Sequence, residues 1–218
     1  MRKELRVYQA EAIADCRRLI KEGKKRVIVH LPTGAGKGVI LVEVALNAIE
    51  KGNRVLFIVK GRQLVFQTEK LFLNAGLEKE KIKILMGSHT TDNEGALVIA
   101  SVDTVARRKS KINAAVVIVD EMHLSTSPTY QRVFESLGDV IFIGLSATPY
   151  HIGNKGHTFW NGYTQPATPR QLLEASFLTA TKVYARRPVN TKGIKTVAGD
   201  FHTGELEKES NKIMATFF

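Results

Sequence analysis

The segment Thr33-Gly34-Ala35-Gly36-Lys37 combines two glycines with a lysine, three residues after the apolar run Val27–Val29. Glycines let backbone N–H groups close around phosphate oxygens, and the first turn of a helix predicted to follow adds positive potential. The Lys37 ammonium would then reach the outer phosphates of a nucleotide. The alternative is a glycine turn with a purely structural role, but the adjacent lysine and the strand–loop–helix context favour a phosphate-binding loop.

Two carboxylates, Asp120 and Glu121, directly follow the apolar run Val116–Val119. Charged groups at the end of a buried strand are unfavourable unless a cation or hydrogen bonds compensate them. Mg²⁺ held by phosphates would supply that compensation. Asp120 would help to hold the ion through water, and Glu121 would orient or deprotonate an attacking water. The alternative is an aspartate that caps a helix beside a solvated glutamate.

A third segment, Ser146-Ala147-Thr148-Pro149, follows the apolar run Ile141–Gly144. Alone it is a turn with small hydroxyl residues. In open α/β sheets, however, ligands bind at the carboxyl ends of strands. The order and spacing of the three segments therefore predict that they meet at one edge of a sheet.

The elements that must position these loops alternate between strand-like and helix-like patterns. Short runs rich in Val and Ile predict strands, and amphipathic runs between them predict helices. The strands are expected at 27–29, 55–59, 82–85, 97–100, 115–119 and 140–143, and the helices at 6–22, 39–50, 63–74, 102–107 and 129–137. Strands that are apolar on both faces and separated by helices indicate a parallel sheet covered on both sides. We therefore expect an α/β fold with a three-layer, doubly wound, mostly parallel sheet.

The character of the chain changes after Pro149, where Gly, Asn, Thr, His and Pro become frequent and periodicity weakens. We place the main domain at residues 1–150 and interpret 151–218 as a peripheral extension or linker. Within it, local patterns predict a short helix at 171–174, a strand at 182–185 and a helix at 205–214.

Composition narrows the class of protein. The 218 residues include 32 Lys and Arg against 21 Asp and Glu, for a formal charge of +11 and a pI near 9.8. This charge favours polyanionic partners such as nucleic acid and nucleotides, although a generally basic, soluble surface is the alternative. No apolar run approaches the roughly 20 residues of a membrane span, and the first residues lack a signal-peptide pattern. We expect no membrane partner and a cytoplasmic protein, in the host cytoplasm if it is phage-encoded.

Other residues with chemical potential have simpler interpretations. The single cysteine, Cys16, excludes an internal disulfide framework and is expected to be a small buried helix residue. The lone Trp160 is expected to anchor packing. Four histidines lack metal-ligand spacing and are expected to be core or surface residues: His30, His151, His157 and His202.

Six segments, taken in order, resemble the motifs of the first RecA-like domain of superfamily 2 helicases, in the DEAD/DEAH-box-like group that includes many phage and bacterial DNA helicases. They are Leu5–Gln9 (glutamine motif), Pro32–Lys37 (motif I), Lys60–Val65 (motif Ia), Ala100–Arg108 (motif Ib), Asp120–His123 (motif II, in DEMH form) and Ser146–Pro149 (motif III). The resemblance covers almost the whole chain. It implies a P-loop NTPase fold, ATP and Mg²⁺ as cofactors, and an ATP-dependent helicase or translocase acting on DNA or RNA, with DNA favoured.

The resemblance also implies roles for individual residues. The catalytic set is Lys37, Asp120 and Glu121, with Asp120 as the magnesium residue. The nucleotide-binding set is Arg6, Tyr8, Gln9, Thr33, Gly34, Ala35, Gly36, Lys37 and Gly38, in which Gln9 would hydrogen-bond adenine. Contacts to the phosphates of a single strand would come from Arg62, Gln63, Thr104 and Arg107. Coupling between nucleotide and nucleic acid would involve His123, Ser146 and Thr148.

Two departures from the family pattern limit what the resemblance implies. Gly38 stands where the family has a Thr or Ser whose hydroxyl coordinates magnesium, so we expect nucleotide to bind and hydrolysis to be slow. Leu31 also replaces the first glycine of the phosphate-loop pattern, which the family tolerates.

The family closes its ATP site with a second RecA-like domain, which this chain does not contain and which would act in cis or in trans. The segment Val183–Phe201 resembles the passage toward it. The chain alone is therefore expected to be weakly active or inactive, and truncated, split and stand-alone forms stay open.

Two other classes of protein remain as alternatives. A non-catalytic nucleic-acid-binding module would explain Gly38 and the basic charge. A P-loop kinase or another NTPase is opposed by the glutamine motif and by Ser146–Pro149.

Overall fold

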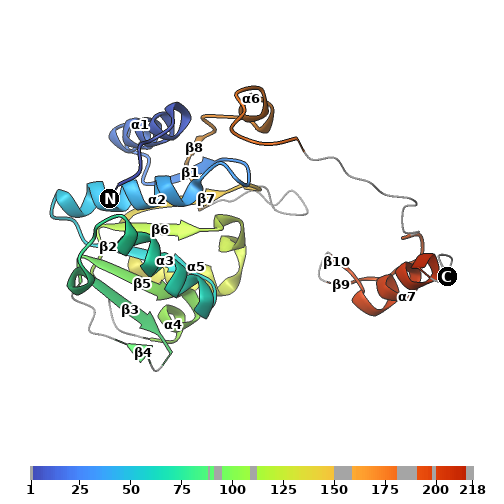
Figure 1. The fold of residues 1–218 in the computed structure, drawn as a ribbon. Coiled ribbons are helices and arrows are strands. Elements are labelled where there is room, and N and C mark those ends of the chain that lie inside the picture. Colours follow the sequence, from blue (N-terminus) through green and yellow to red (C-terminus); the bar gives the residue numbers. More distant parts are fainter. Residues whose placement is uncertain are drawn as a thin grey trace. The chain divides into compact units, whose positions relative to one another are not determined.

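The computed structural model describes residues 2–87, 89–90, 95–108, 112–149, 159–180, 191–197 and 200–214 (Figure 1). The chain divides into two compact units, Met1–Leu178 and Thr179–Phe218. No helix in the described part of the chain is long and apolar enough to span a membrane.

The first unit is built around an eight-stranded sheet. Its strands are β1 (Arg26–His30), β2 (Val55–Val59), β3 (Ile82–Met86), β4 (His89–Thr90), β5 (Leu97–Ser101), β6 (Val116–Asp120), β7 (Ile141–Ser146) and β8 (Gly162–Thr164). Its helices are α1 (Val7–Lys21), α2 (Lys37–Glu50), α3 (Arg62–Asn74), α4 (Val102–Arg107), α5 (Pro128–Leu137) and α6 (Pro169–Glu174), with short 3₁₀ turns η1 (Lys79–Lys81) and η2 (Met122–Thr126). The strand order is β4-β3-β5-β2-β6-β7-β1-β8, and every pairing except β3 with β4 is parallel. The predicted α/β, doubly wound, mostly parallel sheet is confirmed.

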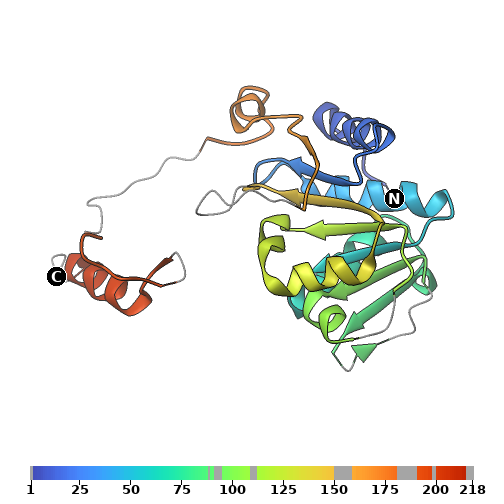
Figure 2. The same ribbon diagram turned by 180° about the vertical axis from the view of Figure 1, so that it is seen from behind.

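Helices cover both faces of this sheet, and successive residues of each strand contribute to opposite cores. In β2, Val55, Phe57 and Val59 pack with α1, α2 and α3, whereas Leu56 and Ile58 pack with α4 and α5. Figure 2 shows α5 in front of the sheet and α2 behind it. Burial on both faces explains why the strands are continuous apolar runs without alternation.

The sheet extends beyond the predicted end of the main domain at residue 150. Strand β8 pairs in parallel with β1, with Ile28 opposite Tyr163, and α6 also belongs to the first unit. Part of the segment expected to be peripheral therefore adds an edge strand and a helix to the main domain.

The second unit contains the antiparallel strands β9 (Thr196–Val197) and β10 (Asp200–Phe201), followed by α7 (Thr203–Met214). The helix predicted at 205–214 is confirmed. The strand predicted at 182–185 lies outside the described residues, and the role of this unit as a linker toward a second domain stays a prediction.

Cys16 and Trp160 are packing residues, as the sequence predicts. Cys16 is buried in α1, and this burial raises the pKa of its thiol to about 12. Trp160 is 8% exposed and donates a hydrogen bond from Nε1 to Ser125 Oγ over 3.1 Å. Gly144 in β7 lets Trp160 lie this close, because an added Cβ would meet Trp160 at 2.6 Å and Met122 at 2.7 Å.

Candidate functional site

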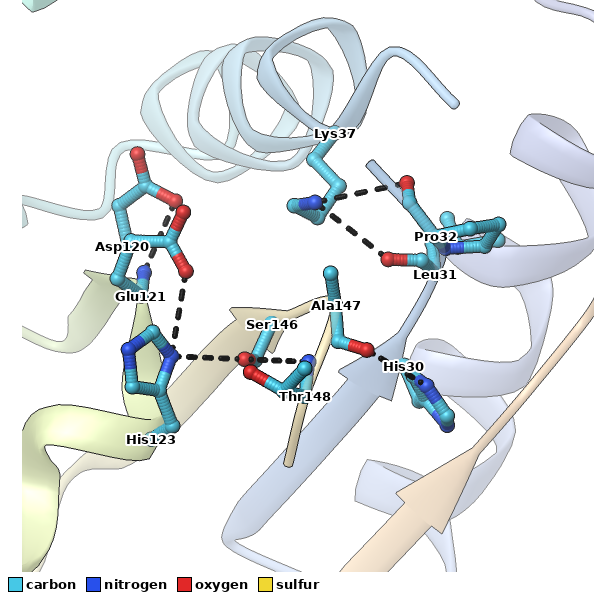
Figure 3. A network of polar contacts seen from close by, with 10 residues as sticks. All are labelled: His30, Leu31, Pro32, Lys37, Asp120, Glu121, His123, Ser146, Ala147 and Thr148. Atoms are coloured by element: carbon cyan, nitrogen blue, oxygen red, sulfur yellow. Dashed lines mark hydrogen bonds and ion pairs between the residues drawn. The ribbon is translucent and has the colours of Figure 1, made fainter. Parts of the chain in front are cut away.

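The phosphate-loop candidate lies between the carboxyl end of β1 and the first residue of α2. Gly34 and Gly36 adopt left-handed φ angles of 83° and 74°, which side chains rarely tolerate. Lys37 Nζ donates to the carbonyl oxygens of Leu31 at 3.4 Å and Pro32 at 3.5 Å (Figure 3). The loop therefore curls around the lysine head at the start of a helix.

The three glycines of this loop differ in the space around them. A Cβ at Gly36 would lie 2.6 Å from Gln9 Nε2, and one at Gly34 would lie 2.9 Å from Leu178 Cδ2. A Cβ at Gly38 would meet only Leu71 Cδ1, at an ordinary 3.7 Å, and Gly38 has no left-handed φ. Gly34 and Gly36 are required by geometry, whereas the site has room for a side chain at position 38.

Asp120 ends β6, and Glu121 turns the chain into η2 with a left-handed φ of 51° and ψ of 53°. Asp120 Oδ1 accepts a hydrogen bond from the Glu121 N–H at 3.0 Å. Burial and the neighbouring Glu121 charge raise the pKa of Asp120, while the hydrogen bond, Lys37 and His123 oppose the shift. The influence of Lys37 on this carboxyl reflects the sheet order, since β6 and β1 both flank β7. The lysine and the two carboxylates thus lie at the same edge of the sheet (Figure 3), and their catalytic and metal-binding roles stay predictions.

Motifs II and III are joined through His123. Its Nδ1 lies 3.2 Å from Glu121 Oε2 and 3.0 Å from Ser146 Oγ, and the Thr148 N–H donates to the same hydroxyl oxygen at 3.0 Å (Figure 3). A carboxylate can only accept, so the Glu121 contact is a hydrogen bond when Nδ1 carries the proton. The single Nδ1–H is then shared between Glu121 Oε2 and Ser146 Oγ, which also accepts the Thr148 N–H, so that the serine proton remains to be donated. The three residues predicted to couple the sites are thus in contact.

His30 lies at the same edge, which the sequence did not indicate. Its Nε2 donates to the Ala147 carbonyl at 3.1 Å, and its Nδ1 lies 2.8 Å from the Tyr163 hydroxyl of β8. Partial burial, together with the Lys37 charge, lowers the pKa of His30 against the opposing effect of the Ala147 contact. The neutral imidazole therefore ties β1 and β8 to motif III. No group of three or more His, Cys, Asp or Glu in the described residues forms a metal cluster, while His151 and His157 lie outside them.

The glutamine motif is bound to the loop itself. Gln9 is 4% exposed; its Nε2 donates to the Ala35 carbonyl at 3.2 Å, and its Oε1 accepts the Arg6 N–H at 3.0 Å. Tyr8 donates from its hydroxyl to the same carbonyl at 2.9 Å. The structure thus brings these residues to motif I, and the adenine contact of Gln9 stays a prediction.

Residues predicted to contact nucleic acid have different surroundings. Arg62 and Gln63 are exposed in the first turn of α3, and Arg107 is exposed at the end of α4. Thr104, by contrast, is 4% exposed, and its Oγ1 accepts the Gly87 N–H at 2.9 Å. The predicted phosphate contact of Thr104 is not supported, because its hydroxyl faces the interior and holds the turn at Gly87.

An open cavity of about 390 Å³ lies between α4 and α5. Arg107 and Arg132 both line it, and each uses Nε to bind a backbone carbonyl of its own helix, at 3.0 and 3.4 Å. Asp103 also lines the cavity. Arg132 lies in no recognisable motif, so sequence reasoning missed it; only the packing of α5 against α4 brings it beside Arg107.

The fold and this edge together define the class of RecA-like nucleotide-binding domains that form the N-terminal half of a superfamily 2 helicase core. Residues 2–151 match the model of the family described as "Type III restriction enzyme, res subunit", and the chain belongs to this family.

Individual relatives agree with the assignment. The chain is 30% identical over 166 residues to an irc3 protein of Schizosaccharomyces pombe whose name describes a mitochondrial ATP-dependent helicase, covering 70% of this chain and 27% of that protein. The UvsW helicase from bacteriophage T4 matches in structure with a TM-score of 0.61 and 22% identity, over 75% of this chain and 61% of that one. A nuclease-deletion mutant of the type ISP restriction-modification enzyme LlaGI, solved in complex with a DNA substrate mimic, matches with a TM-score of 0.59 and 15% identity. The match covers 80% of this chain and 21% of that one.

These relatives are longer proteins. The chain spans between 27% and 38% of the length of the first curated relatives it matches. Family membership therefore describes one domain of such proteins.

Proposed function

We propose that the chain is the ATP-binding domain of an ATP-dependent nucleic-acid helicase or translocase. The observation that carries the proposal is the arrangement at one sheet edge, where the three motifs lie together: His123 links motif II to motif III, and His30, at the end of the strand before motif I, contacts motif III. Such a convergence of a lysine, two carboxylates and a hydroxyl suits phosphate-anhydride chemistry, which depends on positioning and charge.

In this proposal the phosphates of ATP bind the backbone N–H groups of the motif I loop and the Lys37 ammonium. Among the described residues, the hydrogen bonds of Lys37 Nζ go to two backbone carbonyls, and these are weak partners that a phosphate oxygen would replace. Gln9 holds the loop through the hydrogen bond from its Nε2 to the Ala35 carbonyl. The other donor and acceptor positions of its amide would hydrogen-bond the adenine.

The donor set also fits Mg²⁺. Asp120 and Glu121 offer hard carboxylate oxygens, and burial raises the pKa of Asp120, so a cation bound at this edge would stabilise its charged form. Mg²⁺ would neutralise charge on the transferring phosphoryl group. Asp120 would hold it through water, and Glu121, whose carboxylate is held by His123, would orient the attacking water.

A single strand of nucleic acid is the proposed partner. The net charge of +11 and the exposed cations Arg62 and Arg107 favour contact with the phosphate backbone. The relative solved with a DNA substrate mimic supports DNA. A second RecA-like domain, in cis or in trans, would complete hydrolysis by adding arginine groups opposite the phosphates.

Titration with ATP and Mg²⁺ tests the nucleotide part of the proposal. Wild type and Lys51→Ala, which changes an exposed lysine just beyond the other end of α2, are expected to bind alike, and Lys37→Ala at least tenfold more weakly. Hydrolysis by the chain should be very slow and should rise with single-stranded DNA once a second RecA-like domain is added. Equal binding by all three proteins would refute a phosphate-binding loop.

Binding of labelled single-stranded DNA tests the surface. Arg62→Ala and Arg107→Ala should each weaken binding and reduce the salt slope by about one. Arg17→Ala is the matched control, since Arg17 lines a cavity with Val116 and Ile141, the first residues of β6 and β7, at the opposite edge of the sheet. An equal effect of all three substitutions would indicate only a generally basic surface.

One observation favours a second candidate function. Gly38 lacks the hydroxyl that the family uses, as a non-catalytic nucleic-acid-binding module would. Such a module would bind DNA with the same affinity with or without ATP and Mg²⁺, and Lys37→Ala would leave that affinity unchanged.

A further inference from the structure

The short segment after α6 forms a turn that is closed by backbone hydrogen bonds. Thr168 caps α6 through the Gln171 N–H, and the N–H groups of Phe177 and Leu178 both donate to the Leu172 carbonyl, at 2.8 and 3.0 Å. The chain reverses direction between the end of α6 and Phe177. Phe177 and Leu178 are therefore positioned by a hydrogen-bonded turn.

That turn requires an unusual backbone. Ser176 has a left-handed φ of 59°, and among the described non-glycine residues only Glu121 shares this property. Such positions are unfavourable for a side-chain residue and concentrate at ligand clamps and active sites. Glu121 lies in motif II; Ser176 directs the chain toward motif I.

The segment contacts both motifs that are expected to bind nucleotide. Leu178 lies so close to motif I that its Cδ2 is 2.9 Å from where a Cβ of Gly34 would stand. The Phe177 ring packs edge-on against Tyr8, with centroids 5.4 Å apart, and the Arg6 guanidinium carbon lies 4.7 Å from the Phe177 centroid. α6 and α1 accordingly lie close together in both views (Figures 1 and 2).

Phe177 is not simply a core residue. It is 39% exposed, whereas Tyr8 beneath it is 5% exposed. An aromatic ring with accessible surface, beside a guanidinium, offers two planar groups that can stack on a nucleobase. Stacking of this kind recognises the π face of any base, while hydrogen bonds choose among bases.

We propose that Phe177, together with Arg6, forms the wall of the site on which the base of the bound nucleotide stacks. This inference rests on the proposed ATP binding and adds to it a residue from outside the motifs. The phosphates would be bound by motif I and the base by the turn after α6, so the two contributions are separable by ligand chemistry.

Calorimetric titration of ATP and of inorganic tripolyphosphate, which has no base, tests the separation. Phe177→Ala should weaken ATP binding by about 5- to 160-fold, the range expected for the loss of one stacked base. It should change tripolyphosphate binding by less than twofold. Phe177→Tyr should restore ATP binding, and Leu173→Ala, an equally exposed apolar residue of α6, should leave both ligands unaffected.

A fluorescent variant gives a readout that does not depend on the alanine variant folding. Phe177→Trp adds a second indole to the protein. The single native tryptophan, Trp160, is buried in the core on the other face of the sheet. ATP should quench the new emission and tripolyphosphate should not. The wild-type protein treated in the same way is the control.

The outcomes distinguish the inference from the proposed function. If wild type binds tripolyphosphate and ATP with equal affinity, or if Phe177→Ala weakens both ligands equally, the base wall is refuted while the phosphate loop stands. If wild type binds neither ligand, the proposed function itself fails and the inference fails with it.

Discussion

Replacing Gly38 with threonine tests whether the missing hydroxyl limits the use of Mg²⁺. Gly38 is the second residue of α2, and its position tolerates a side chain: the nearest atom to an added Cβ is Leu71 Cδ1 at 3.7 Å. A cavity of about 110 Å³ lined by Gly38, Val42 and Leu71 adjoins it. Threonine is a slightly better helix former than glycine, so the free energy of unfolding should change by less than about 0.5 kcal/mol.

The effect on nucleotide binding should be larger than the effect on stability. A contact between a neutral oxygen and a charged group contributes about 1.5–3 kcal/mol. That range corresponds to about 10- to 160-fold in affinity for the ATP–Mg²⁺ complex. The gain should appear only when the metal is present, because the hydroxyl is expected to act through it.

The assay is the ratio of the dissociation constants for ATP measured in EDTA and in Mg²⁺. Gly38→Thr should raise this ratio about tenfold or more over wild type. Gly38→Val is the matched control, since valine has the shape of threonine without the hydroxyl, and it should leave the ratio unchanged. If threonine and valine give the same ratio, or if threonine leaves turnover with a second domain unchanged, Gly38 does not limit the site.

Three further predictions follow from the geometry of the first unit. Gly36→Ala should lower the free energy of unfolding in urea by about 1–2 kcal/mol and weaken ATP binding. Alanine is strained at φ 74°, and its Cβ would displace Gln9. Unchanged stability would contradict the left-handed conformation of this loop. Asp120→Asn should raise the melting temperature of the nucleotide-free protein while abolishing hydrolysis. The pKa of Asp120 is raised in the folded protein, so ionisation of this carboxyl lowers stability as the pH rises above its ordinary value of 3.8. The increase in melting temperature that the asparagine gives at pH 7 should therefore vanish toward pH 3. A variant that melts below wild type at pH 7 would argue against this. Cys16, whose thiol pKa is about 12, should resist alkylation at pH 8 in the native protein and react within minutes in denaturant, as followed by mass spectrometry; rapid native labelling would show that α1 opens.

The fold was predictable where residues close in sequence determine the structure. Strand β2 begins and ends at the predicted residues, Val55 and Val59, because an apolar run buried on both faces is a local signal. Strand β8 is the contrast. Its three residues, Gly162–Thr164, have no periodic pattern and form a strand only through backbone pairing with β1, so no local rule could reveal it.

The candidate site shows the same division. The positions of Lys37 and Asp120 followed from the rule that parallel strands present their carboxyl ends at one edge. The burial of Thr104 did not follow from its motif, because it depends on which face of the short helix α4 packs against the sheet. Phe177 and Arg132 were missed for a related reason: each becomes a neighbour of a motif residue only when distant elements pack.

The contacts at the sheet edge also explain how one nucleotide could influence several parts of the domain. Glu121 has a left-handed conformation and its carboxylate contacts His123, so under the proposed mechanism a change at the attacking water would alter the partner of Ser146. Ser146 in turn fixes the Thr148 backbone, and His30 fixes Ala147 between them. Motif III is therefore held from two sides, by His123 and by His30, and in the proposed ATP complex both contacts would lie beside the bound phosphates. Such an arrangement has few relaxed alternatives, so a movement of motif III is the expected consequence of gaining or losing the terminal phosphate.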